Sequence, residues 1–222
     1  SHDGQFYFVS VQLRPSGHST PHSASQAIAR FRADGSGVDL LPSEKGSYIF
    51  ACDPGGSGIM CGRASGSRHD FWLMDYDGAN EKFFTRNAFA HSSWLGKTGK
   101  LQGCARFPSR AVLVATCGQE HPQLLVQGPY FWHSASTLDG EWIISDTNWP
   151  DEGLQLINVS TRRFRTLCYP LSSEGHPQWT HPHPSFSPDG ELVLFNSDRT
   201  GVAQIYLATI PGEMRQELSQ ER

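Results

Sequence analysis

Short apolar runs alternate with glycine-containing turns along most of the chain. Runs of roughly four to eight residues that are bounded by turn residues are typical of β-strands. Three of the runs directly follow an Asp-Gly pair, which suggests that one turn and strand unit is repeated. Only the tail, residues 213–222, has a helical or frayed pattern. The pattern predicts strands at residues 5–11, 71–78, 81–85, 141–145, 154–158, 163–167, 191–195 and 204–208.

The turns recur at a regular distance. Their spacing is close to the roughly 40–50 residues of a propeller blade. This period predicts an all-β chain, a β-propeller of four-stranded blades with about five blades present. The first turn has no strand before it, so residues 1–222 are expected to form one partial β-propeller domain that starts inside a blade. The turns stand at residues 3–4, 54–56, 96–99, 139–140 and 189–190.

Three histidines occupy one position of this repeat. His91, His133 and His183 each stand at the same spacing before a turn, at residues 97, 139 and 189. In a propeller the first strand of each blade lines the central channel. Neighbouring blades are therefore expected to direct the three side chains into one funnel.

The segment from Gln178 to His183 holds several side chains that could bind a metal. Side chains alternate between the two faces of an extended strand, so His181 and His183 are predicted to point the same way, with the adjacent prolines keeping the backbone extended. Neutral imidazole is the commonest protein metal ligand, and Gln178 adds an amide oxygen. The alternative is a proline-rich edge strand whose histidines only form hydrogen bonds.

Composition narrows the classes of partner. The chain is 37% hydrophobic with a net charge of −4, which allows a large core and argues against a nucleic acid or a membrane surface bound through bulk charge. No apolar run reaches the roughly 18–20 residues of a transmembrane helix. Five scattered cysteines, an odd number, predict reduced thiols and a cytoplasmic location.

The C-terminal half resembles a known family, the oligogalacturonate lyases, which are metal-dependent β-propeller enzymes of pectin breakdown. The discriminating motif is Gln178-x-x-His181-x-His183, followed by Phe-Ser-Pro-Asp-Gly at residues 186–190 and Gln-Ile-Tyr at residues 204–206. The latter two segments also occur in TolB-like and peptidase propellers. The resemblance is strong from about residue 128 onward and weak before residue 60.

The resemblance implies a site for a divalent ion, usually manganese, together with the residues that bind the ion. It also implies a catalytic histidine, which maps to His91, and a catalytic arginine, for which Arg68 is the better match and Arg63 the reserve. The family's fold has about seven blades, so about two are expected to be missing on the N-terminal side. An irregular second strand is expected near residues 100–108. The implied metal ligands are His133, Gln178, His181 and His183.

The activity implied by the resemblance is cleavage of oligogalacturonides by metal-assisted β-elimination, with an acidic oligosaccharide as substrate and no nucleic-acid or membrane partner. Removing the proton at C5, beside the uronate carboxylate, builds negative charge that a metal and an arginine can stabilise. A neutral histidine is a suitable base. Two alternatives stay open: a non-enzymatic TolB-like propeller that binds protein partners, and a propeller lyase for another uronate. Convergence of the four ligands would favour a lyase over a scaffold.

Overall fold

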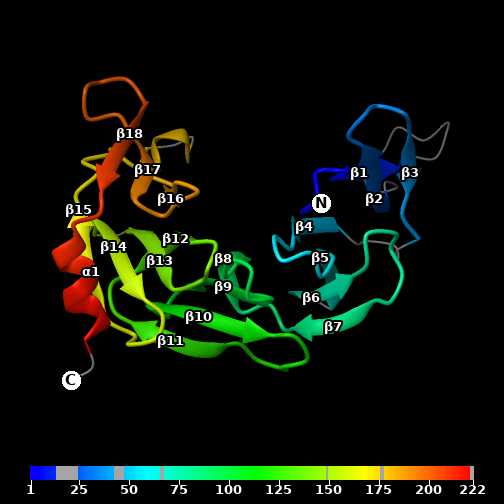
Figure 1. The fold of residues 1–222 in the computed structure, drawn as a ribbon, viewed down its shortest axis with the longest axis horizontal. Helices are drawn as coiled ribbons and strands as arrows, with labels where there is room; N and C mark the ends of the chain where they lie inside the picture. Colours follow the sequence, from blue (N-terminus) through cyan, green and yellow to red (C-terminus); the bar gives the residue numbers. More distant parts are fainter. Residues whose placement is uncertain (14–24, 43–47, 66–67, 149, 176–177, 221–222) are drawn as a thin grey trace. The chain divides into compact units, whose positions relative to one another are not determined.

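The computed structural model describes the whole chain except residues 14–24, 43–47, 66–67, 149, 176–177 and 221–222. The chain divides into two compact units. The first comprises Ser1–Asn87 and Ala115–Pro122, and the second comprises Ala88–Val114 and Gln123–Arg222. Strands dominate both units (Figure 1). Within the described ranges, no helix has the length and apolar character needed to span a bilayer.

The first unit contains two antiparallel sheets, ordered β1-β2-β3 and β4-β5-β6-β7. Buried side chains from both sheets form one cluster, which includes Ile28 of β2 and Ile59, Cys61 and Met74 of the second sheet. The strands are β1 (Phe6–Leu13), β2 (Ser25–Arg32), β3 (Val38–Leu40), β4 (Tyr48–Cys52), β5 (Ile59–Ser65), β6 (Arg68–Met74) and β7 (Lys82–Thr85).

The second unit contains three antiparallel sheets, except for the last two residues of β10, and the strands stand in chain order within each sheet. A short helix, α1 (Gly212–Ser219), follows the last strand. The strands are β8 (Phe89–Trp94), β9 (Lys100–Ala105), β10 (Ala111–Thr116) and β11 (Gln123–Gln127), then β12 (Phe131–Ser136), β13 (Trp142–Thr147), β14 (Leu154–Asn158) and β15 (Phe164–Cys168), and finally β16 (Ser185–Phe186), β17 (Leu192–Ser197) and β18 (Gln204–Thr209).

The blade repeat predicted from the sequence is confirmed. The described residues form five sheets, three with four strands and two with three, and each is a meander of consecutive antiparallel strands. All the predicted strands are present within a few residues of their expected bounds, and the predicted helical tail corresponds to α1. The fold is therefore all-β and is built from β-propeller blades.

Two turns show that the units of the repeat are equivalent in detail. Asp139 accepts a hydrogen bond from the backbone N–H of Glu141 at 2.9 Å, and Asp189 accepts the corresponding bond from Glu191 at 3.1 Å. The glycine after each aspartate has a positive φ, +75° at Gly140 and +77° at position 190. A side chain is strained in this left-handed conformation, so the Asp-Gly pair is needed for both hairpins.

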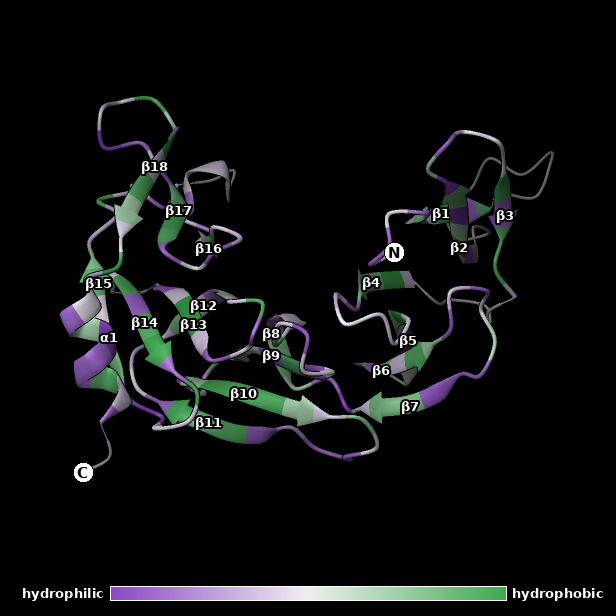
Figure 2. Ribbon diagram, in the orientation of Figure 1, coloured by the Kyte–Doolittle hydropathy of each residue, from purple (hydrophilic) through white to green (hydrophobic). Residues whose placement is uncertain are grey.

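Buried apolar residues join neighbouring blades in the second unit. One cluster includes Leu95 and Val112 of the β8–β11 blade with Phe131 and Ile143 of the next blade. A second cluster joins the β12–β15 blade to β17 and to Leu218 of α1. The hydropathy colouring shows mostly apolar β10 and β14, whereas α1 alternates between polar and apolar residues (Figure 2). Because burial of apolar surface is the main stabilising term, these clusters hold the three blades of this unit together.

Candidate metal and catalytic site

Strands β8 and β12 each contain a bulge beside a predicted site histidine. In β8 the pairing register shifts between Phe89 and His91. In β12 it shifts between Phe131 and Ser134, the interval that contains His133. A bulge inserts one extra residue and re-aims the side chains next to it. The irregularity expected near residues 100–108 was therefore placed wrongly, because β9 is a continuous strand and the extra residue belongs to its partner, β8.

Asp146 fixes the position of His133 through two contacts. Its Oδ1 accepts a hydrogen bond from the backbone N–H of His133 at 2.6 Å, and its Oδ2 lies 2.9 Å from the Nδ1 atom of the ring. Both residues are buried, with 1% of Asp146 and 8% of His133 exposed. A buried carboxylate that accepts from Nδ1 holds the proton on that nitrogen, so Nε2 keeps its lone pair.

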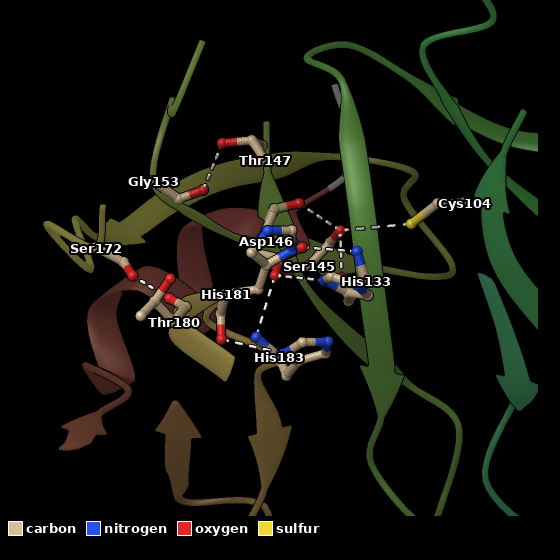
Figure 3. A network of polar contacts seen from close by, with 10 residues as sticks. All are labelled: Cys104, His133, Ser145, Asp146, Thr147, Gly153, Ser172, Thr180, His181 and His183. Atoms are coloured by element: carbon tan, nitrogen blue, oxygen red, sulfur yellow. Dashed lines mark hydrogen bonds and ion pairs between the residues drawn. The ribbon is translucent and has the colours of Figure 1, made fainter. Parts of the chain in front are cut away.

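The same carboxylate also contacts the segment that carries His181 and His183. The backbone N–H of His183 donates to Oδ2 of Asp146 at 3.1 Å, and Nδ1 of His183 lies 3.1 Å from the carbonyl oxygen of His181. Figure 3 shows Asp146 between the two histidine-bearing segments.

The backbone of this segment is not the extended strand that the sequence predicted. Gln178–Thr180 is a turn of 3-10 helix, and His183 has a φ of +42°. The first strand of this blade, β16, begins only at Ser185. The prediction was wrong because the alternating proline and histidine pattern says nothing of the distant Asp146, to which the backbone N–H of the left-handed His183 donates.

Four imidazole rings nevertheless gather at one place. The ring centre of His133 lies 4.5 Å from that of His91, 3.8 Å from that of His183 and 5.6 Å from that of His181. The centres of His181 and His183 are 5.8 Å apart. His181 is buried, His91 is half-buried and His183 is exposed. The sequence therefore correctly predicted that these histidines converge, although it gave the wrong backbone for two of them.

Crowding keeps at least two of the rings neutral. Burial, and then repulsion from His133, lowers the pKa of His91 to about 4. The pKa of His183 is also lowered, first by burial and then by His133. Desolvation and neighbouring positive charge both disfavour the imidazolium form. Near neutral pH these rings consequently offer lone pairs rather than positive charge.

Side chains at the end of β17 anchor the connection between β15 and β16. Ser197 is fully buried and donates to the carbonyl oxygen of Pro170 at 2.7 Å. The Arg199 guanidinium donates to the same oxygen at 2.7 Å, and Asp198 accepts from the backbone N–H of Ser173 at 2.7 Å. No motif in the sequence identified these three consecutive residues as part of the site. They fix the start of the segment that leads to His181.

The remaining predicted residues are not brought into this cluster by the described part of the structure. Gln178 opens the 3-10 turn and Arg68 opens β6, and the side chains of both lie outside the described residues. Arg63 is buried in β5, where its guanidinium pairs with Glu81 and lies 4.6 Å from the ring centre of Trp72. Arg63 and Arg68 belong to the first compact unit, whereas the histidines belong to the second.

Carboxylates differ in their contacts with the clustered histidines. Asp146 pairs with His133, whereas Glu120 is exposed and pairs with Arg86 at 3.1 Å. Glu174, in the connection between β15 and β16, is a carboxylate that no sequence motif pointed to. Burial, followed by repulsion from Asp151 and Asp146, raises its pKa to about 7. Its Oε1 atom is buried without a hydrogen-bond partner among the residues that the structure describes.

The donor set fits a transition-metal ion at one clear point. The Nε2 atom of His133 is buried and has no hydrogen-bond partner in the described part of the chain, while Nδ1 is fixed by Asp146. A carboxylate–histidine pair with a free second nitrogen is the usual arrangement behind a metal ligand. Among the described residues, however, no three His, Cys, Asp or Glu side chains form a complete metal-binding group. The fit rests on His133 and on the proximity of the other rings.

The sequence is similar to curated proteins of one family. An oligogalacturonide lyase from Pectobacterium atrosepticum is 34% identical, over 41% of this chain and 28% of the relative. An oligogalacturonate lyase from Dickeya dadantii is 28% identical, over 65% of this chain and 44% of the relative. The matched regions thus span less than half the length of these curated relatives. No protein-family model matches the chain.

Solved structures confirm the propeller fold. An oligogalacturonate lyase in complex with manganese superposes with a TM-score of 0.71 at 22% identity, covering 86% of this chain and 56% of the other. TolB from Acinetobacter baumannii superposes with a TM-score of 0.61 at 13% identity, covering 91% of this chain and 50% of the other. At these identities the likeness concerns the fold alone. Because the curated sequence matches both bear the name that the motif around Gln178 implied, the resemblance of this chain to the oligogalacturonate lyases is confirmed.

Proposed function

We propose that this chain is part of a lyase that cleaves oligogalacturonides by metal-assisted β-elimination, in the degradation of pectin. The observation that carries the proposal is the buried Asp146–His133 pair: the Nε2 atom of His133 is unpaired among the described residues, and its ring centre lies within 5.6 Å of three further imidazole rings. The names of the sequence relatives, both lyases of this class, support the same substrate. The five free cysteines support a reducing compartment, and we place the protein in the cytoplasm.

The residues that would hold the ion are His133, Gln178, His181 and His183. Three imidazole nitrogens and one amide oxygen suit manganese, zinc or iron better than calcium or magnesium, which prefer oxygen ligands. Manganese is the first choice, because it is the ion bound in the solved lyase. When bound, the ion supplies positive charge that stabilises negative charge on the uronate carboxylate.

His91 is the proposed base. Its neutral ring would take the C5 proton of the uronate, the electron pair would form the C4–C5 double bond, and the glycosidic C4–O bond would break, with the departing oxygen taking a proton from solvent water. The low pKa of His91 keeps the ring in the basic form. Arg68 is proposed to bind the uronate carboxylate through two parallel hydrogen bonds, a geometry that a lysine cannot provide.

Turnover and bound metal in paired variants of the full-length protein test these roles. His91→Ala should lower turnover by about 10²- to 10⁴-fold while manganese content stays normal. His133→Ala should lower both together, because the ligand and its charge are lost. Turnover is followed as ultraviolet absorbance of the unsaturated uronate formed from digalacturonate. Normal turnover in His91→Ala would remove His91 from the mechanism, and a wild-type protein that cleaves no uronate would favour a TolB-like binding propeller.

A further inference from the structure

The turn between β9 and β10 carries a large apolar side chain that takes no part in the core. Phe107 is 79% exposed, more than any other large hydrophobic side chain in the described residues. Its neighbours in the turn, Arg106 and Arg110, are exposed as well. An exposed aromatic ring adds little to the stability of the fold, because its apolar surface stays in water. Such rings are enriched at binding surfaces.

Aromatic rings connect this turn to the histidine cluster. The ring centre of Phe107 lies 6.0 Å from that of Tyr130 in an edge-to-face arrangement. Tyr130 lies 5.6 Å from Trp132, and Trp132 lies 4.9 Å from His91. These separations are in the range of favourable aromatic pairs. The series of rings therefore leads from an exposed turn to the proposed base, entirely within the second compact unit.

The topology explains why the turn and the histidines lie at one end of their strands. Phe89, the first residue of β8, pairs with Ala105, the last residue of β9, so the turn after β9 is beside the start of β8. His91 stands near that start. Tyr130 immediately precedes β12. The aromatic series and the imidazoles consequently share the same end of this pair of blades.

The two arginines make the surface around Phe107 positively charged. Neither the Arg106 nor the Arg110 side chain forms a hydrogen bond or an ion pair with any other residue in the described part of the chain. Exposed guanidinium groups without an acidic partner attract anions and can bind a carboxylate through two hydrogen bonds. The chain as a whole carries a net charge of −4, so the local positive charge at this turn is not a consequence of composition.

We propose that Phe107, together with Arg106 and Arg110, forms a subsite for a second uronate of the oligosaccharide, one or more rings away from the bond that is cleaved. The apolar face of a pyranose would lie against the Phe107 ring, and its carboxylate would bind a guanidinium. A ring plus a carboxylate matches a uronic acid and does not match a neutral sugar. This subsite rests on the proposed function, since it names where the rest of that substrate lies.

Binding and cleavage of galacturonides of different length test the subsite. Phe107→Ala should weaken the affinity for tetragalacturonate about three- to tenfold, measured by calorimetry in chelator so that no turnover occurs. Arg106→Gln with Arg110→Gln should weaken it about two- to fivefold, and more at low salt. With manganese present, kcat/KM should fall for tetragalacturonate and stay near wild type for digalacturonate.

Matched controls stand in turns at other positions of the blades. Leu138→Ala removes an exposed apolar side chain and Arg162→Gln an exposed cation, and neither should change the affinity. Equal affinity of the wild type and Phe107→Ala for tetragalacturonate would overturn the subsite, even if digalacturonate is cleaved normally. Conversely, failure of the wild type to cleave digalacturonate would overturn the proposed function, while the binding comparison would still decide the subsite.

Discussion

His133 and the pair His181 and His183 reach the same place by different means. His133 lies in β12, between strands of two blades, and Ser145 donates to its carbonyl oxygen at 2.8 Å. The other two follow a connection whose described residues form no strand, and its start is held by side chains at the end of β17. His133 stands at the bulge of β12, so the side chains of Asp146 and Ser145 hold its backbone N–H and carbonyl, while strand residues on either side of it pair with β13. A residue in a connection lacks such paired neighbours and depends on a few side chains alone. The connection should therefore tolerate single substitutions less well.

Asp146 is where the two halves of the site meet, and its substitution should have the largest effect. Asp146→Asn keeps the shape of the side chain but replaces one acceptor oxygen with an amide group. The His133 ring would lose the partner that fixes its tautomer, and His183 N–H would lose part of its acceptor. Loss of such a partner typically lowers metal affinity about 10- to 100-fold. Manganese titration of the full-length protein measures the change.

The control for this prediction is Glu141→Gln, which removes an exposed carboxylate at the far end of β13. Its manganese affinity should equal that of the wild type. Thermal unfolding in chelator distinguishes lost ligand orientation from lost folding. If Asp146→Asn binds manganese as tightly as the wild type, the Asp146 carboxylate positions the backbone of the two segments and not the metal-binding rings. The difference between His133 and the pair His181 and His183 then has another cause.

Substitution of two buried serines, one beside His133 and one beside the connection to His181, compares these two parts of the site directly. Ser197 donates to Pro170 in the connection, and Ser145 donates to His133 in the strand. Ser145→Ala removes the side-chain donor to the carbonyl oxygen of His133, at a cost of about 1–3 kcal/mol in the free energy of unfolding. Ser197→Ala should cost less, because the Arg199 guanidinium still donates to the Pro170 oxygen. We expect the larger loss of stability for Ser145→Ala but a fall in manganese affinity for Ser197→Ala only, because the paired strand residues on either side of the bulge keep His133 in place. Urea unfolding and manganese titration give the two values, and equal losses of affinity would contradict the distinction.

The blade repeat could be predicted from sequence because its signals are local. Asp139-Gly140 and Asp189-Gly190 specify a hairpin by the φ of the glycine and the hydrogen bonds of the aspartate, both within a few residues. The strand after each turn is marked by its own apolar run. Position in the repeat then brought His91 and His133 together, because equivalent strands in successive blades lie side by side.

The details that failed depend on contacts between distant residues. The left-handed His183 donates its backbone N–H to Asp146, 37 positions away, a contact that no local pattern reveals. The anchoring of Pro170 by Ser197 is likewise a contact between a connection and a strand residue 27 positions further along the chain. The two bulges depend on how β8 and β12 pair, since an extra residue is visible only against its partner strand. The roles of Arg68 and Gln178 remain predictions.

The smallest effect is expected when glycine is compared with alanine at His183, in the connection, and at His133, in β12. At His183, with a φ of +42°, alanine carries the steric cost of the left-handed conformation, about 1–2 kcal/mol, and glycine does not. At His133, within β12, glycine should be the worse residue by about 0.5–1 kcal/mol, because it loses more conformational entropy on folding. His183→Gly should therefore unfold at a higher urea concentration than His183→Ala, and the order should reverse at His133. All four proteins lack a proposed ligand and are compared in chelator, so metal binding does not contribute. If alanine were the more stable variant at both positions, the backbone of His183 would relax once its ring is removed. The contacts of the imidazole, and not the connection, would then impose the left-handed conformation.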